Sequence, residues 1–168
     1  MEVSILQPIG RRKRLESSET VSFIELVRSS HEELSDLPVI DRSGEKWQGK
    51  AIILPPQIGS GVVFGLDIEE VGDEIMISFD HSHIHLAWPP RPCNDTGRIW
   101  HDGLALVDAI LNEKVLASSG WIDGALRVGA LHEADVPPDL LVPALHHIRV
   151  RSWRGTLNRD EAREPNGS

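Results

Sequence analysis

Two runs of alternating apolar residues, separated by a short polar turn, constrain the fold of this chain more than any other feature. The apolar positions are Val62, Phe64, Leu66 and Ile68 in the first run, and Ile75, Ile77 and Phe79 in the second. Successive side chains of a strand point to opposite faces, so each run predicts a strand with one buried face. The turn at residues 70–73 predicts that the two strands form an antiparallel hairpin.

Three histidines follow the second run at alternate positions, in the segment DHSHIH. In an unbroken strand His81, His83 and His85 would share one face, where Asp80 could complete an open metal site. The apolar positions change parity after Phe79, however. That change predicts a turn, a bulge or a second tight hairpin directly after the strand, and it weakens the simple metal-site geometry.

A metal site would need further ligands from distant parts of the chain. The sequence offers these candidates: His101, His132, Glu133, His146 and His147. Spacing alone does not place them beside the DHSHIH segment, so the favoured interpretation is that its histidines are surface, partner-facing or half-buried polar residues. No cofactor is predicted, and metal binding by His81, His83 and His85 remains the alternative.

The rest of the pattern predicts helices and further hairpins. Helical spacing predicts an amphipathic helix from Thr20 to Leu34, capped by Ser17 or Ser18, and a second helix from Asp95 or Thr96 to about Glu113. Strands are expected at 50–54, at 115–121 and 126–131 around an Asp-Gly turn, and at 147–153. The predicted class is α+β: five to seven mostly antiparallel strands built from hairpins, with two main helices packed on the sheet.

Polar and charged ends flank a single predicted domain. Residues 1–17 carry the basic cluster RRKR and are expected to be a flexible arm. Residues 157–168 are polar and are expected to be a disordered tail, which leaves residues 18–156 as one α+β domain.

The formal net charge is -9, and its distribution matters more than its sum. The interval between Lys50 and Arg91 contains no Lys or Arg. It carries six acids, namely Asp67, Glu69, Glu70, Asp73, Glu74 and Asp80. Phosphate backbones would be repelled, so nucleic acid is not an expected partner, whereas a basic protein surface is. A merely solvated acidic face is the simpler alternative.

Other residues that could carry chemistry receive structural interpretations. Cys93 is the single cysteine and has no nucleophile signature around it, so a bystander thiol is favoured. At least two of Trp88, Trp100 and Trp121 are expected in the core. Arg149 and Arg151 are expected on one strand face, where they could bind an anion, although pairing with the acidic surface of the same protein is the favoured interpretation.

The sequence contains neither a signal-peptide pattern nor a run of about eighteen apolar residues, so a cytoplasmic protein without a membrane partner is expected.

The order of elements between about Gly61 and Leu131 resembles a known class of proteins. A strand ending in Asp-His-x-His-x-His precedes a Trp-containing helix running to LVDAILNEK, and the hairpin VLASSGWIDGALRVGAL follows. This arrangement is similar to small immunity-type proteins encoded beside bacterial polymorphic toxins. The resemblance implies a non-enzymatic protein that binds a cognate toxin and blocks its active site or substrate access. It transfers no catalytic residue.

The expected toxin-binding surface combines the acidic interval with the neighbouring histidines. Its candidate residues are Asp67, Glu69, Glu70, Asp73, Glu74, Asp80, His81, His83 and His85. The alternative function is a small metal-binding protein or metal-dependent hydrolase that uses the DHSHIH segment.

Overall fold

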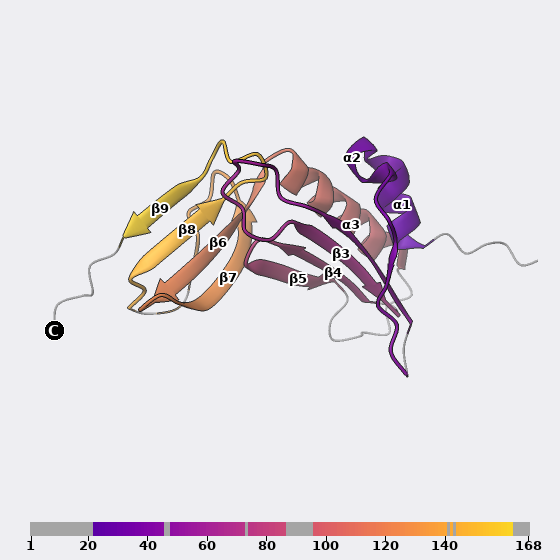
Figure 1. Cartoon of the computed structure of the whole chain (residues 1–168), viewed down its shortest axis with the longest axis horizontal. Coiled ribbons are helices and arrows are strands. Elements are labelled where there is room, and N and C mark those ends of the chain that lie inside the picture. The colour runs from indigo at the N-terminus through magenta and orange to yellow at the C-terminus, as the bar shows by residue number, and fades with distance from the viewer. Residues whose placement is uncertain are drawn as a thin grey trace, which may run out of the picture.

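The computed structural model describes residues 22–45, 48–72, 74–86, 96–140, 142 and 144–162. Within this part the chain forms three helices and nine strands (Figure 1). The helices are α1 (Phe23–Ser30), α2 (Glu32–Ser35) and α3 (Thr96–Leu111). The strands are β1 (Ile40–Asp41), β2 (Gly49–Leu54), β3 (Leu66–Val71), β4 (Glu74–Phe79), β5 (Ser82–Leu86), β6 (Val115–Ile122), β7 (Ala125–Glu133), β8 (His147–Arg151) and β9 (Arg159–Ala162).

The strands divide between two antiparallel sheets rather than one. Sheet 1 has the order β1-β2-β3-β4-β5, and sheet 2 has the order β7-β6-β8-β9. Neighbouring strands in sheet 1 are also neighbours in the chain, as expected for hairpin connections. The α+β class and the hairpins are therefore confirmed, although the described residues contain more strands than the predicted five to seven.

The turn after β4 resolves the change of apolar parity. Asp80 has a left-handed backbone, with φ of 52°. β5 then pairs antiparallel with β4, with Phe79 opposite Ser82 and Ile77 opposite Ile84. Of the three alternatives, the second tight hairpin is correct, and it moves His81 out of the strand that contains His83.

The helices cover one face of sheet 1. Phe23, Ile24 and Val27 of α1 are fully buried against the inward face of β2, β3 and β4, and α3 adds Val107 and Ile110 to the same core. In Figure 1, α3 lies behind β3–β5. The opposite face of sheet 1 has no helix on it within the described residues, and it is called the open face below.

The expected helix from Thr20 to Leu34 is two helices, because His31 has an extended backbone with φ of -133°. α1 is capped by Ser22, whose hydroxyl accepts from the backbone N–H of Glu25 while the Glu25 carboxylate accepts from Ser22 N–H. The N-cap of α1 is therefore Ser22, which forms a capping box. The predicted caps Ser17 and Ser18 lie outside the described residues, together with the basic arm.

The first predicted strand begins at Leu66 rather than Gly61. Gly61 has a φ of +72°, and a Cβ on Gly65 would lie 2.0 Å from the carbonyl oxygen of Leu54, so the chain bends before it enters β3. The alternation therefore misplaces Phe64, which is 56% exposed, whereas Val62 does pack against the core as predicted.

Part of the predicted disordered tail is ordered. β9 pairs with β8, with Arg149 opposite Asp160. The Arg151 guanidinium donates to the Asp160 carboxylate at 2.6 Å. The polar composition of this segment predicted disorder. An edge strand can nevertheless be polar, because backbone pairing with a neighbouring strand is enough to hold it in the sheet.

The two sheets meet where the β4–β5 turn abuts β6 and β7. A Cβ on Gly129 would lie 2.1 Å from the carbonyl oxygen of His81, and the Ser82 hydroxyl donates to the carbonyl of Ser118. Only a residue without a side chain allows this approach, so Gly129 sets how closely the sheets pack.

No helix in the described ranges is long and apolar enough to cross a membrane.

We expect Gly129→Ala to destabilise the protein by about 1–3 kcal/mol, because the new methyl group must push two backbones apart. Urea denaturation followed by circular dichroism measures this change. Arg127→Gln, at an exposed neighbouring position on β7, is the control and should stay within about 0.5 kcal/mol of the parent. Equal stability of the two variants would show that the sheets do not pack as described.

Candidate functional site

The open face of sheet 1 gathers polar side chains from three adjacent strands. Cross-strand pairing places Asp67 opposite Ser78, and Ser78 opposite His83. In the next row Glu69 lies opposite Met76, and Met76 opposite His85. Directly paired residues project from the same face of a sheet. Strand alternation therefore brings Asp67, Glu69, His83 and His85 to one face of the sheet. The adjacent predicted residue Glu70 points to the other face.

The acids on the open face are only partly solvated. The side chains of Asp67 and Glu69 are 26% and 17% exposed, and both lie beside the Arg42 guanidinium, at 3.6 and 3.8 Å. Partial burial raises the pKa of the Asp67 carboxyl, the negative charge of Glu69 raises it further, and Arg42 lowers it in part.

One oxygen of this carboxylate has no protein partner. Asp67 Oδ1 is buried and accepts no hydrogen bond from the described residues. Buried carboxylate oxygens are normally hydrogen-bonded, because losing water without a replacement costs free energy. Asp67 therefore destabilises the folded protein in its ionised form.

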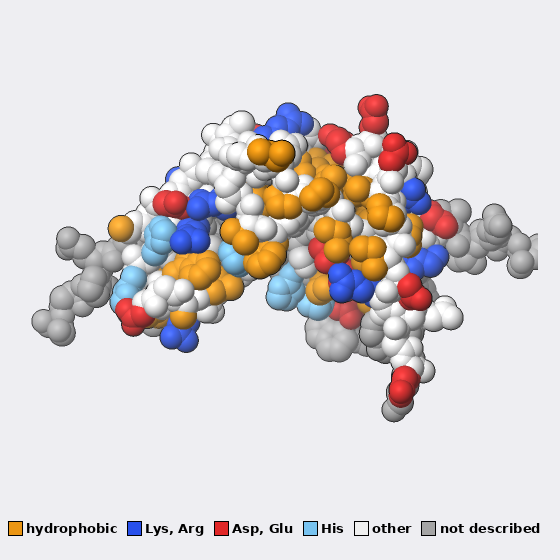
Figure 2. Space-filling model, viewed as in Figure 1, with side chains coloured by type: hydrophobic (Ala, Val, Ile, Leu, Met, Phe, Trp, Pro, Cys, Tyr) orange, Lys and Arg blue, Asp and Glu red, His pale blue; other side chains and the backbone are white. Residues whose placement is uncertain are grey.

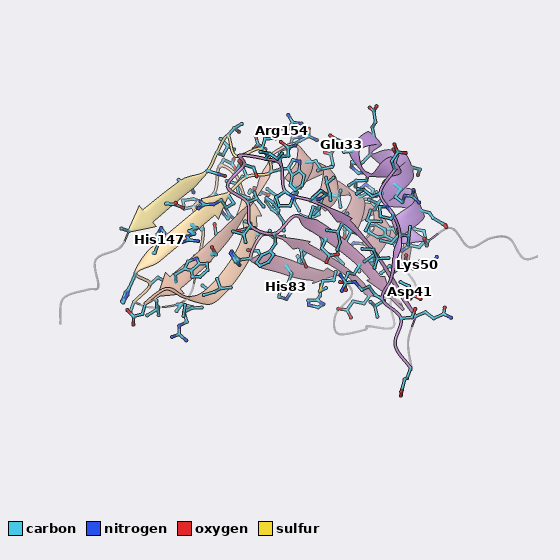
Figure 3. All side chains as sticks on the ribbon, viewed as in Figure 1. Glu33, Asp41, Lys50, His83, His147 and Arg154 are labelled. Atoms are coloured by element: carbon cyan, nitrogen blue, oxygen red, sulfur yellow. The ribbon has the colours of Figure 1, made fainter. Side chains whose placement is uncertain are left out.

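The two strand histidines lie beside one another at the edge of sheet 1. The rings of His83 and His85 are 5.1 Å apart and nearly perpendicular. His85 Nδ1 also contacts the Glu74 carboxylate. Figure 3 shows His83 at the margin of the molecule opposite Glu33, which lies on α2. Glu74, His83 and His85 thus extend the polar surface of the open face to its edge.

Asp80 has a structural role instead of the expected surface role. It is only 8% exposed, and its Oδ1 accepts from the backbone N–H groups of Val63 and Phe64 at 2.8 and 3.4 Å. The Asp80 N–H donates in turn to the Phe64 carbonyl. The side chain therefore fixes the loop before β3 and is not presented to a partner.

Two other predicted acids do not contribute to the open face. Glu70 points to the helix-covered side, where its carboxylate accepts from the backbone N–H of Ile24 in the first turn of α1. An acid at a helix N-terminus is favourable because of the helix dipole. Asp73 lies outside the described residues.

The four residues of the predicted metal site do not converge. Asp80 holds a loop, and the His81 ring packs against Phe64 and Trp121 rather than beside His83. In the described ranges no group of three or more His, Cys, Asp or Glu residues could hold a metal ion. The simple geometry of the DHSHIH site is therefore wrong, because a hairpin turn separates its members.

The additional histidine candidates have their own partners elsewhere. His132 Nε2 shares a hydrogen bond with the Ser118 hydroxyl on sheet 2, and His146 lies 3.3 Å from Asp123. His101 lies beside Asp102 on α3. Glu133 and His147 belong to β7 and β8. Cys93 lies outside the described residues.

A second cluster, which the sequence did not reveal, lies where the sheets meet. His81 packs edge-on against Phe64 at 5.0 Å and against Trp121 at 5.2 Å, measured between ring centroids. The Arg149 guanidinium carbon lies 4.7 Å from the Trp121 ring centroid. These four residues, Phe64, His81, Trp121 and Arg149, are called the aromatic row below.

The aromatic row adjoins the open face. Ala117 of β6 belongs to the core beneath the helices, whereas Trp121, on the same strand face, lies past the β4–β5 turn that abuts the sheet. Phe64 lies two residues before β3 and His81 directly before β5, so the row lies at the end of the strands that carry Asp67 and His83. Figure 2 views the open face, with histidine, hydrophobic and Lys or Arg side chains neighbouring one another across both sheets.

Local pattern carried little information about the aromatic row. Phe64 was expected to be buried, and Trp121 was grouped with Trp88 and Trp100 as mostly core. Trp100 does pack against the core, Trp121 is half-buried outside both core clusters, and Trp88 lies outside the described residues. The large buried tryptophan is Trp153.

The two arginines on β8 share a face, as predicted, but not the expected partners. Arg151 pairs with Asp160 of β9 and donates to the carbonyl of Gly61. The hydrogen bond from Arg151 lowers the pKa of the Asp160 carboxyl. Arg149 stacks on Trp121 instead. Neither pairs with the acids of the open face, because Arg151 is engaged by the Asp160 carboxylate of its own sheet and Arg149 by the Trp121 ring.

We expect Asp80→Ala to destabilise the protein by about 2–4 kcal/mol, because two backbone N–H groups lose their acceptor and the left-handed position loses a residue that tolerates it. Asp80→Asn keeps an acceptor oxygen and a residue suited to this backbone, so its loss should be clearly smaller. Urea denaturation compares the two. Equal losses would mean that the Asp80 hydrogen bonds are not the source of the stability.

We expect Asp67→Asn to be more stable than the parent at neutral pH, by less than about 1 kcal/mol because nearby water screens the charge. The pKa of Asp67 is raised on folding, so ionisation is harder in the folded than in the unfolded state. The advantage should shrink as the pH falls through the folded-state pKa, where the parent carboxyl is itself protonated.

Urea denaturation across a pH series checks this prediction, with Asp135→Asn, at an exposed loop position, as the control. An Asp67→Asn variant that is less stable at neutral pH would show that the carboxylate is well paired.

No family model, curated protein or solved structure matches this chain. The residues of the open face and the aromatic row are therefore the basis on which a function is proposed.

Proposed function

We propose that this chain is an immunity-type protein that binds a basic bacterial toxin through the open face and thereby neutralises it. The observation that carries the proposal is Asp67, a partly desolvated carboxylate with one oxygen that no described residue satisfies. Polar groups that cost stability are retained most often at functional sites. A cation from a partner that lies against the partly exposed Asp67 side chain would offset this cost through its charge, without contacting the buried Oδ1 itself.

The electrostatics of the open face favour a basic partner over bulk solvent. Asp67 and Glu69 project from the same face of β3, so their negative charges repel one another at short range. Arg42 is shared between them and offsets only part of that repulsion. Acids that only keep a protein soluble are usually well exposed, because burial removes hydration from an ionised carboxylate. A second cation at this position would therefore be bound favourably.

The proposed contact residues are fewer than the sequence suggested. Asp67, Glu69, Glu74, His83 and His85 line the open face, whereas Glu70 and Asp80 are engaged with the backbone of their own chain. Charges at an interface mainly accelerate association, and tight binding also needs an apolar anchor. The exposed residues Val63 and Phe64, in the loop before β3, supply apolar surface next to the strand that carries the acids.

The resemblance of residues 61–131 to immunity-type proteins is what directs the proposal to a bacterial toxin. Active sites that bind nucleic acids or other anions are basic, so an acidic inhibitor surface complements them. The proposal assigns no catalytic residue to this chain. The metal-dependent alternative has no favourable observation in the described residues, since Asp80 and His81 are committed to other contacts.

Co-expression with the product of the adjacent gene tests the proposal. We expect a stable complex, and we expect the partner to harm cells that lack this protein. Glu69→Lys should slow association by about tenfold or more, because it reverses a charge on the open face. The effect should diminish in high salt, which screens steering between charged surfaces.

Glu33→Lys makes the same charge change on exposed α2, on the side away from the open face (Figure 3). Its association rate should stay close to that of the parent. If the neighbouring product neither binds this protein nor harms cells without it, the immunity proposal fails. If both variants slow association equally, the protein binds but the open face is not the interface.

A further inference from the structure

The aromatic row forms a continuous series of contacts from the loop before β3 to β8. Phe64 contacts His81, and His81 contacts Trp121. The Arg149 guanidinium in turn lies over the Trp121 ring. The Trp121 N–H donates to the Ser119 hydroxyl at 3.0 Å, which fixes the orientation of the indole. The row is thus held in place before any partner arrives.

Arg149 is the member whose hydrogen-bonding capacity is incompletely used. Its Nε is buried and finds no hydrogen-bond partner among the described residues. Arg151, two residues along the same strand face, donates instead to the Asp160 carboxylate and to the Gly61 and Val150 carbonyls. A guanidinium presents its donors in a planar fork that suits carboxylates. The two terminal nitrogens of Arg149 make no hydrogen bond to a described residue and, unlike its Nε, are not buried, so they are the donors that a partner can reach.

The opposite end of the row is apolar and exposed. Phe64 is 56% exposed, and the adjacent Val63 is 54% exposed. Asp80 holds both residues in place through their backbone N–H groups. A large apolar side chain held outward by a buried carboxylate loses the burial that normally stabilises it in a fold.

The chemistry of the row matches that of interface hot spots. Trp, Arg and other aromatic residues dominate the few positions that contribute most to protein–protein affinity, and these positions cluster together. The row also carries a cation, whereas the adjoining open face carries acids. The two neighbouring surfaces therefore differ in charge sign, and a partner that spans both must carry both signs in a fixed order.

We propose that the aromatic row binds an extended segment of a partner protein that carries a carboxylate beside a large apolar side chain. The carboxylate accepts hydrogen bonds from Arg149, and the apolar side chain packs against Phe64 and Trp121. This inference rests on the proposal that the open face binds a protein, and it adds that the same partner offers an acidic and apolar segment next to its basic one.

A displayed library of random peptides about twelve residues long tests the inference without the cognate toxin. Such peptides span roughly 40 Å when extended, enough to reach across a sheet face. Panning on the full-length protein should enrich peptides with Asp or Glu close to a large apolar residue. Individual enriched peptides should bind Arg149→Gln at least about tenfold more weakly than the parent.

Arg127→Gln is the matched control, because it removes the same charge from an exposed position on β7 of the same sheet. Binding to it should equal binding to the parent. Arg149→Lys keeps the charge but loses the planar fork, so its affinity should also fall. Phe64→Ser, at an exposed position, should keep the preference for acidic residues and lose the preference for large apolar ones, which provides a second test if Arg149→Gln does not fold.

The inference is overturned if no peptide is enriched, or if enriched peptides bind the parent and the Arg149→Gln variant equally. It is also overturned if acidic residues are not enriched. These outcomes are separate from a failure of the toxin proposal, which appears in co-expression with the neighbouring gene and in the Glu69→Lys variant.

Discussion

The contact between the β4–β5 turn and sheet 2 is the constraint on which the rest of the structure depends. The His81 carbonyl lies against Gly129, and Ser82 bonds to the Ser118 carbonyl, so the end of one sheet is fixed to the face of the other. Asp80, in the same turn, holds the loop before β3. One short turn thus positions both the junction of the sheets and the exposed aromatic side chain beside it.

This arrangement explains why the molecule presents two chemically different surfaces next to one another. Helices cover one face of sheet 1, and the open face keeps the acids of β3 together with the histidines of β5. Sheet 2 emerges beyond the turn with Trp121 and Arg149. A basic protein segment suits the first surface and an acidic, apolar one suits the second, so specificity is expected from the order of charges rather than from total charge.

Prediction from sequence succeeded where a local rule decides the structure. Alternation identified the β3–β4 hairpin, the parity change located the turn after Phe79, and Asp123-Gly124 marked the turn between β6 and β7. It failed where distant contacts override the local pattern. Phe64 alternates like a buried residue yet is exposed, because its backbone is bound by Asp80, which follows it by sixteen residues.

The sequence by itself determined the α+β class, the hairpins and the concentration of acids between residues 50 and 91, because strand periodicity and charge are properties of neighbouring residues. Only the tertiary structure decided which of those residues act together. It placed Asp67 and Glu69 beside Arg42, separated His81 from His83, and brought Arg149 onto Trp121. Such contacts depend on strand pairing, on turn conformation and on the approach of two sheets, which no local pattern encodes.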